Sequence, residues 1–148
     1  MTQEDKALLL KDLCARLPYG VKCQIDYDNE EDTDLGIERY HDDRVVSVCI
    51  ATEEIGLYEA SAYFYPDNIK PYLFPLSSMT VEQQKEANIF DDMDMDILSE
   101  NLGRNHRNKT NIPTATYNYI DWLNKNHFDY RGLIEKGLAI DATRLNIY

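Results

Sequence analysis

Three aspartates at alternate positions, Asp92, Asp94 and Asp96, have the spacing in this chain that most resembles a metal site. Alternate carboxylates can converge on a hard cation such as Ca²⁺. An EF-hand loop also needs glycine at its sixth position and glutamate at its twelfth, where this chain has Ile97 and Gly103. We therefore expect no metal site here and interpret these acids as a helix start, which the helix dipole favours.

Cysteine and histidine are the next candidates, because a thiolate can act as a nucleophile beside an imidazole base. Cys49 could pair with His41 or His127, but nothing in the sequence selects a pairing. The three cysteines lack the C-x-x-C spacing of a zinc site. Cys14 falls on the apolar side of a helix, and Cys23 and Cys49 fall at inward positions of strands. We therefore expect three buried, unreactive thiols.

Other catalytic patterns are missing or unselective. The six glycines form neither a G-x-G-x-x-G nor a Walker motif, so we expect no nucleotide cofactor. With 27 acidic residues, some pair of carboxylates will be close in any fold, and this abundance identifies none of them. We name no catalytic residue, no metal ligand and no cofactor, and we expect the chain not to be an enzyme.

A basic cluster in the polar loop 103–112 is the candidate for contact with an anion or an acidic partner. Its members are Arg104, Arg107 and Lys109. Residues 1–100 carry a net charge of −15 and residues 101–148 a net charge of +3. The alternative interpretation is a solvated loop that relieves repulsion from the acidic part of the chain.

Aromatic residues supply the candidates for an interface, because 11 of the 16 aromatics are tyrosines, which suit half-buried sheets and protein contacts. Three surfaces are considered: a tyrosine-rich sheet face, the segment 70–76 and an aromatic band at 117–130. The band has a second interpretation, the packing of a helix against the sheet. The candidate interface residues are Tyr72, Phe74, Tyr117, Trp122, Phe128 and Tyr130.

Length and charge set the class of protein. The 148 residues, 43% of them hydrophobic, are enough for one globular domain spanning 1–148. The net charge of −12 argues against a general binder of nucleic acid or of anionic membranes. The first residues lack a basic region followed by an apolar core, and no stretch is long enough to span a bilayer. We expect a cytoplasmic protein.

The first half of the chain is predicted to form a helix followed by strands. Thr2 caps a helix that runs through Arg16 and stops at Pro18. Alternation predicts a strand at 21–27, and the acidic loop 28–34 follows it. The remaining predictions are a short strand at 37–40, a turn at 41–43, and strands at 44–51 and 56–65. Two prolines predict that 70–76 is an extended segment on the surface of the core, outside any central strand.

The second half is predicted to be helical. Thr80 and Gln83 form a capping box for a helix from about Val81, and a second helix is predicted at 91–100. A third helix is capped by Thr114 or Thr116 and runs to about Asn126, and a last short helix covers 133–138. The predicted fold class is therefore α+β: an N-terminal helix, a small, mainly antiparallel sheet, and C-terminal helices packed on it.

Three segments also carry a resemblance. The motifs RLPYGV at 16–21, KPYLxPxSSMT at 70–80 and HFDYRGLIEKGLA at 127–139 resemble a family of small proteins encoded by gut anaerobes and by their phages and mobile elements. That family has no assigned activity. It commonly has a basic residue at the position of Phe74, so no anion-binding role is carried over to the proline segment. The resemblance implies a phage or mobile-element setting, and then the cytosol of the host cell.

These observations favour a non-enzymatic protein that regulates another protein by binding it, with a host or defence protein as the target. One version is an acidic decoy that occupies a nucleic-acid site. The alternatives are a small enzyme or small-ligand binder with a pocket between sheet and helices, and a virion or structural component that self-assembles. We expect no membrane partner and no direct contact with nucleic acid, and the sequence is compatible with a homo-oligomer.

Overall fold

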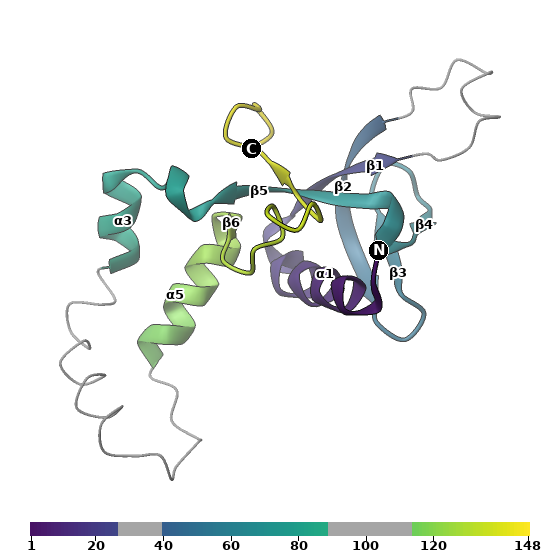
Figure 1. Ribbon diagram of the computed structural model, residues 1–148, viewed down its shortest axis with the longest axis horizontal. Helices are drawn as coiled ribbons and strands as arrows, with labels where there is room; N and C mark the ends of the chain where they lie inside the picture. The colour runs from purple at the N-terminus through teal and green to yellow at the C-terminus, as the bar shows by residue number, and fades with distance from the viewer. Residues whose placement is uncertain (27–39, 89–113) are drawn as a thin grey trace, which may run out of the picture.

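The computed structural model describes residues 1–26, 40–88 and 114–148 (Figure 1). The acidic loop 28–34, the Asp92–Asp96 motif, the predicted helix 91–100 and the basic cluster of 103–112 lie outside the described residues. So does the predicted strand 37–40, apart from Tyr40.

Helix α1 (Gln3–Arg16) begins and ends as its sequence predicts. The backbone N–H of Asp5 donates to the Thr2 hydroxyl at 3.1 Å, and acids in the first turn and Arg16 in the last turn match the helix dipole. A short 3₁₀ turn, Leu17–Tyr19, follows it and closes on Gly20, whose φ of 68° is a left-handed conformation that glycine tolerates.

Within the described residues, the sheet contains seven strands in the order β4-β3-β2-β1-β5-β6, with β7 also paired to β5. The pairs among β1 (Lys22–Asp26), β2 (Tyr40–Cys49), β3 (Glu54–Leu57), β4 (Tyr63–Phe64) and the start of β5 (Ile69–Pro75) are antiparallel. Strands β6 (Phe128–Asp129) and β7 (Ile140–Asp141) pair with the end of β5 in parallel. The sheet is therefore mixed, and the α+β prediction is confirmed.

Two predicted strand boundaries in the first half are wrong. The predicted turn at 41–43 lies inside β2, because Asp42 and Asp43 pair with Gln24 and Cys23 of β1. The predicted strand 56–65 is a hairpin instead: β3 and β4 pair with each other, and the connection turns at Ser61, which has a φ of 49°.

Residues 70–75 are extended as predicted, but the predicted surface position outside any central strand is wrong. Strand β5 lies inside the sheet, and Pro71 pairs with Cys23 of β1. An antiparallel ladder tolerates a proline at this point because only alternate residues donate their N–H to a given neighbour. The second half of β5 pairs with β6 and β7. The backbone N–H of Phe74 donates to the carbonyl of His127, and the backbone N–H of Ala142 donates to the carbonyl of Leu73.

Helices α3 (Val81–Asn88) and α5 (Thr114–Lys125) confirm two helical predictions. The capping box of α3 is present: Gln83 N–H donates to the Thr80 hydroxyl at 3.2 Å, and the Gln83 amide oxygen accepts from Thr80 N–H at 2.9 Å. The predicted last helix at 133–138 is wrong, because residues 133–137 form hydrogen-bonded turns that close at Gly137, whose φ is 70°.

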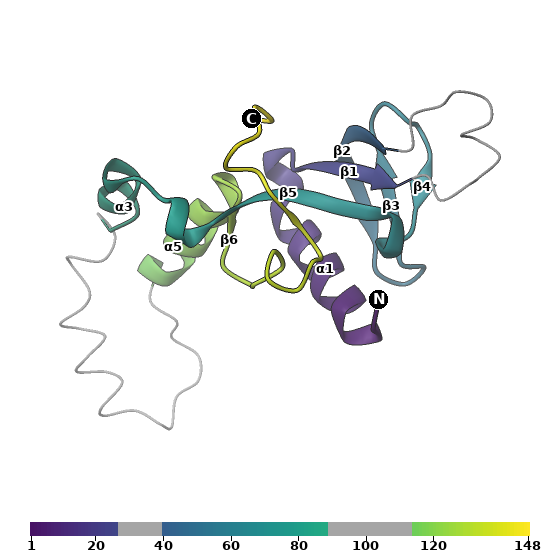
Figure 2. The ribbon, with the colours of Figure 1, turned by 45° about the horizontal axis from the view of Figure 1, so that its top comes forward.

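In the part of the chain that the structure describes, two groups of buried side chains form the core. The larger one packs α1 against the sheet and the 133–139 turns, with Leu9, Leu13, Ile25, Ile55, Ile69, Leu73 and Leu133 all fully buried. The smaller one joins α3, α5 and β6 through Ala87, Trp122, Leu123 and Phe128. Strand β5 runs from one group to the other (Figure 2).

Helix α1 covers one side of the sheet, and the C-terminal segment 142–148 crosses β5 on the other side (Figures 1 and 2). The face of β1–β4 opposite α1, hereafter the helix-free face, has no helix against it among the described residues. No described helix is long and apolar enough to cross a membrane.

Candidate functional site

The helix-free face is identified by strand alternation. Ile55 and Leu57 of β3 are buried toward α1, so Gly56 between them points to the other side. Ser47 and Tyr63 are the pairing partners of Gly56 on either side, and they therefore share the helix-free face. Tyr58 follows Leu57 and alternates onto the same face.

Three tyrosines on this side of the molecule are strongly exposed. The exposed fractions are 61% for Tyr58, 71% for Tyr63 and 56% for Tyr65. Tyr65 extends the backbone one residue beyond β4 and has the same parity as Tyr63, whereas Phe64 between them packs toward the core. Gly56 lets the Tyr63 ring lie close to the sheet, since a Cβ atom at residue 56 would be 3.3 Å from that ring.

Two cations stand side by side in the middle of the face. Lys22 and Arg44 are direct partners in the β1–β2 ladder, a like-charge arrangement that is unfavourable without compensation. Each cation lies over an aromatic ring: Arg44 Cζ is 4.5 Å from the ring centre of Tyr58, and Lys22 Nζ is 5.9 Å from that of Tyr148. The two cations thus lie between two rings, in the order Tyr58, Arg44, Lys22 and Tyr148.

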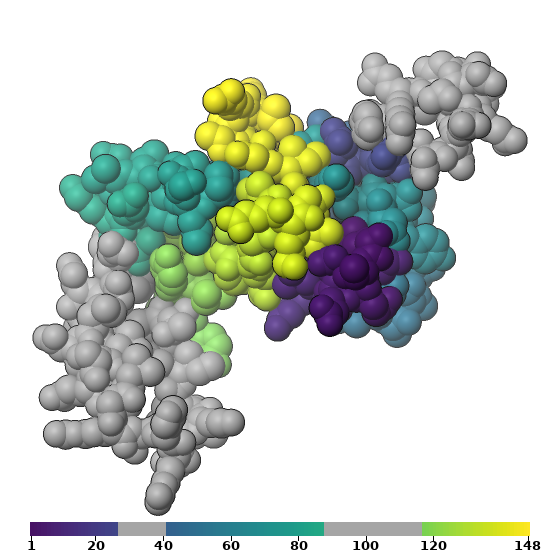
Figure 3. Space-filling view, viewed as in Figure 1, coloured from purple at the N-terminus to yellow at the C-terminus, as the bar shows by residue number. Residues whose placement is uncertain are grey.

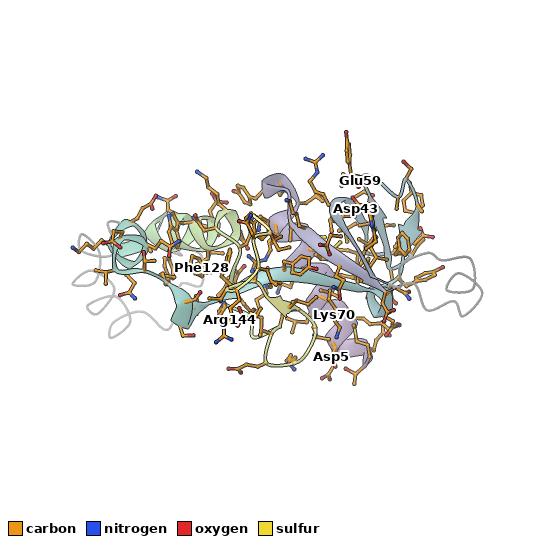
Figure 4. The ribbon with its side chains drawn as sticks, turned by 90° about the horizontal axis from the view of Figure 1, so that it is seen from above. Asp5, Asp43, Glu59, Lys70, Phe128 and Arg144 are labelled. Atoms are coloured by element: carbon orange, nitrogen blue, oxygen red, sulfur yellow. The ribbon has the colours of Figure 1, made fainter. Side chains whose placement is uncertain are left out.

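A cleft of about 320 Å³ opens beside this row. It is lined by Lys22, Asp42, Asp43, Arg44, Tyr58 and Glu59. Figure 4 shows Asp43 and Glu59 together at this end of the molecule, far from Phe128.

The carboxylates of the cleft are already engaged. Buried Asp43 accepts backbone N–H groups from Arg44, Glu59 and Ala60 at 2.6–3.0 Å. Burial alone would raise the pKa of Asp43, but these N–H groups hold it below its ordinary value. Asp42 accepts the Tyr72 hydroxyl at 2.6 Å, and Glu59 lies 3.6 Å from His41.

The Arg44 guanidinium, by contrast, makes no hydrogen bond or ion pair within residues 1–26, 40–88 and 114–148. Its stacking on Tyr58 holds the planar group at the surface with its N–H donors available. Exposed phenol rings beside a positioned guanidinium are suited to binding, because they offer apolar area and directed donors together.

The predicted interface residues are distributed differently from this face. Tyr72, Trp122 and Phe128 are buried, with exposed fractions of 3%, 8% and 2%. Trp122 and Phe128 stack at 5.6 Å, so packing describes this part of the aromatic band. The other three differ: Phe74 and Tyr130 are half-buried, and Tyr117 is exposed on α5.

The cysteine and histidine candidates are not brought together. Cys49, predicted to be buried, is exposed at one end of the ten-residue strand β2, and His41 stands at the other end, about 26 Å away along an extended chain. His127 immediately precedes β6, which pairs with the end of β5. Cys23 is buried as predicted, and burial raises the pKa of its thiol to about 12. Cys14 is half-buried, which also raises the pKa of its thiol.

No group of three or more His, Cys, Asp or Glu side chains in the described part of the chain is arranged to hold a metal ion. The sequence predicted a tyrosine-rich sheet face but did not identify which tyrosines form it. The usable signal was the alternation of Tyr63 and Tyr65 around Phe64, which the prediction of one long strand obscured.

Comparison with protein-family models, with curated proteins and with solved structures found no match to this chain.

Proposed function

We propose that this chain is a non-enzymatic protein-binding module and that the helix-free face is its contact surface. The observation that carries the proposal is the set of three tyrosines, 56–71% exposed, beside an arginine whose guanidinium is stacked on one of them. The central contact residues are Tyr58, Tyr63, Tyr65 and Arg44.

The residue types support this choice. Tyrosine and arginine are enriched among the residues that contribute most to binding energy at protein interfaces. A phenol ring buries a large area at a low cost in side-chain entropy, and the Tyr58 ring already orients the Arg44 guanidinium. A partner that covers this face would bury the rings and accept hydrogen bonds from Arg44.

The charge around the face supports a partner with a basic rim. Asp42 and Glu59 line the cleft beside Tyr58, Glu54 lies two residues before Gly56 on β3, and the whole chain carries a charge of −12. Opposite charge at the rim accelerates association and selects against acidic proteins. In the phage or mobile-element setting implied by the resemblance, the partner is a host or defence protein in the cytosol, and an acidic decoy of nucleic acid is one version of this role.

Affinity capture with matched variants tests the proposal. Tyr58→Ser/Tyr63→Ser removes two exposed rings from the face, and Tyr117→Ser removes an equally exposed ring from α5. Wild type, the double variant and the control are each used to capture proteins from a lysate of the host cell, and the retained proteins are quantified by mass spectrometry. We expect one saturable partner for wild type and Tyr117→Ser, and its loss for the double variant. Equal retention by all three proteins would contradict the proposal.

The cleft beside Arg44 favours a second candidate, the binding of a small ligand. Its volume of about 320 Å³ is at the lower end for ligand pockets, and it combines cations, carboxylates and a tyrosine ring. It lies on the helix-free face, whereas the sequence-based alternative placed a pocket between sheet and helices. Thermal stabilisation by a metabolite that is lost in Arg44→Gln would favour this candidate.

A further inference from the structure

The ladder between β1 and β5 ends in an unusual way. Its pairs run from Ile25–Ile69 to Cys23–Pro71, and the next pair would be Lys22–Tyr72. Pro71 has no N–H, so its pair with Cys23 is a non-hydrogen-bonded one, and alternation makes Lys22–Tyr72 a hydrogen-bonded one. The Tyr148 hydroxyl takes the place of that direct bond, accepting from Lys22 N–H at 3.1 Å and donating to the Tyr72 carbonyl at 3.0 Å.

The Tyr148 ring is also held on its sides. It stacks on the His127 ring at 4.0 Å with an angle of 13° between the planes, and it lies 5.9 Å from the Phe74 ring. Lys22 Nζ lies over the Tyr148 ring and donates to the Ile147 carbonyl at 2.6 Å. The ring's surroundings, hereafter the phenol slot, therefore consist of Lys22, Tyr72, Phe74 and His127.

The segment that supplies this ring is weakly attached by comparison. Residues 142–148 form no helix or strand, and Leu145 and Tyr148 remain 44% and 45% exposed. The backbone N–H of Ala142 donates to the carbonyl of Leu73 in β5. The backbone N–H of Leu145 donates only within the segment, to the carbonyl of Ala142. In Figure 3 this segment stands out from the molecule on the side opposite α1. Residues of β1, of β5 and of the turn before β6 form the slot, and residues 142–148 place the Tyr148 ring in it.

We propose that the phenol slot is a recognition site for a tyrosine side chain of a partner, and that residues 145–148 are a built-in occupant which the partner displaces. Lys22 belongs both to this slot and to the cleft beside Arg44, so the slot extends the contact surface of the proposed function, on which this inference rests. The slot is specific for a phenol, because a hydroxyl there accepts a hydrogen bond from Lys22 N–H and donates one to the Tyr72 carbonyl. Residues 145–148 then act as a competitor that raises the affinity a partner needs.

A peptide titration tests the slot. The probe is a synthetic peptide of residues 141–148, added to the full-length Tyr148→Ala variant and followed by isothermal calorimetry and by the amide signals of Lys22 and Phe74 in NMR spectra. We expect saturable binding to Tyr148→Ala. Binding to the wild type should be at least roughly tenfold weaker, because its own tail competes at an effective concentration on the order of millimolar. A peptide ending in phenylalanine should bind roughly fivefold to tenfold more weakly, since it loses two hydrogen bonds.

Absence of binding to folded Tyr148→Ala, or equal affinity for wild type and variant, would overturn the inference. If Tyr148→Ala does not fold, Tyr148→Phe keeps the ring, and the same peptide should bind it more tightly than the wild type. The outcome is separable from the proposed function: Tyr58→Ser/Tyr63→Ser keeps the slot and should bind the peptide as the wild type does. A failed slot would leave the loss of captured partner in that double variant unchanged.

Discussion

Arg16 and Asp12 are both charged and both fully buried, one turn apart on α1. Arg16 Nε and Nη2 donate to the Asp12 carboxylate at 2.7 and 3.1 Å, and Nη2 also donates to the carbonyl of Phe128 at 2.8 Å. Arg131 Nε lies 3.2 Å from the same carboxylate. A buried ion pair persists only when such contacts compensate its desolvation, so this pair fixes the C-terminal part of the chain to α1.

Removing one member should therefore be costly. We expect Arg16→Met to lower the free energy of unfolding by about 3–5 kcal/mol, because it leaves a buried carboxylate with only Arg131 beside it. Lys11→Met, an exposed neighbour on the same helix, is the control and should change stability by less than about 0.5 kcal/mol. Urea denaturation measures both, and equal small effects would contradict this account of the pair.

His127 makes stability depend on pH. Burial, with a smaller contribution from the Arg16 charge, lowers the pKa of His127 to about 4, from 6.5. The fold therefore favours the neutral imidazole, and this stabilisation is complete above pH 6.5 and is lost as the pH falls toward 4. His127→Asn removes the titration and suits the left-handed backbone at this position, where φ is 58°.

Between pH 7 and pH 5, the free energy of unfolding of the wild type should fall by about 2 kcal/mol more than that of His127→Asn. Urea denaturation at each pH measures both values. Carboxylates titrate in both proteins, so the difference between them isolates His127. The same loss in both proteins would show that His127 is not held neutral.

At the scale of elements, two buried aspartates organise the irregular segments. Asp43 accepts the N–H groups of Glu59 and Ala60 after β3. Asp129 similarly accepts those of Leu133 and Ile134 after β6. Each carboxylate binds backbone N–H groups of residues outside any strand, and the loop held by Asp43 carries Tyr58 onto the helix-free face.

Asp43→Ala should lower the free energy of unfolding by about 2–3 kcal/mol, because it leaves backbone donors without a partner. Asp42→Ala, its neighbour, loses the bond from Tyr72 and should cost about 1 kcal/mol. Hydrogen exchange should show faster exchange of the Glu59 and Ala60 amides in Asp43→Ala alone. Unchanged exchange there would contradict the role of Asp43 in the loop.

How far the sequence predicts each element depends on how local its determinants are. The caps at Thr2 and Thr80 act within three residues, and both helices begin as predicted. Strand β5 depends on distant partners in β1, β6 and β7, which no local pattern reveals, and its prolines argued against a strand. Residues 133–138 have a helical pattern, but Asp129 and Gly137 hold them in turns.

For the whole molecule, the two core groups explain why some of the predicted interface aromatics are buried and others are not. Trp122 and Phe128 fill the smaller group beside α3, a requirement that appears only once α3 and α5 are placed together. The exposed tyrosines belong to strands whose other side is satisfied by the larger group. Sequence composition predicted a tyrosine-rich face. Identifying which tyrosines lie on it required the register of β2, β3 and β4, which depends on contacts between strands.

The overall charge should govern the speed of binding. With a net charge of −12 and carboxylates at the rim of the face, association with a basic partner should slow by at least roughly tenfold between about 0.05 M and 0.5 M salt. Dissociation, which depends on the tyrosines and Arg44, should change little. Surface plasmon resonance separates the two rates, and a flat association rate would exclude electrostatic attraction as a component of recognition.

Contact between the helix-free face and a protein partner can be detected by site-specific photo-crosslinking. A photoreactive phenylalanine analogue replaces Tyr63 on this face or, as the matched control, Tyr117 on α5, which are 71% and 62% exposed. After illumination in the host cell, we expect one dominant crosslinked protein from position 63 and none of that protein from position 117. The same protein crosslinked from position 117 only, or no crosslink from position 63 at full expression of a folded chain, would contradict it.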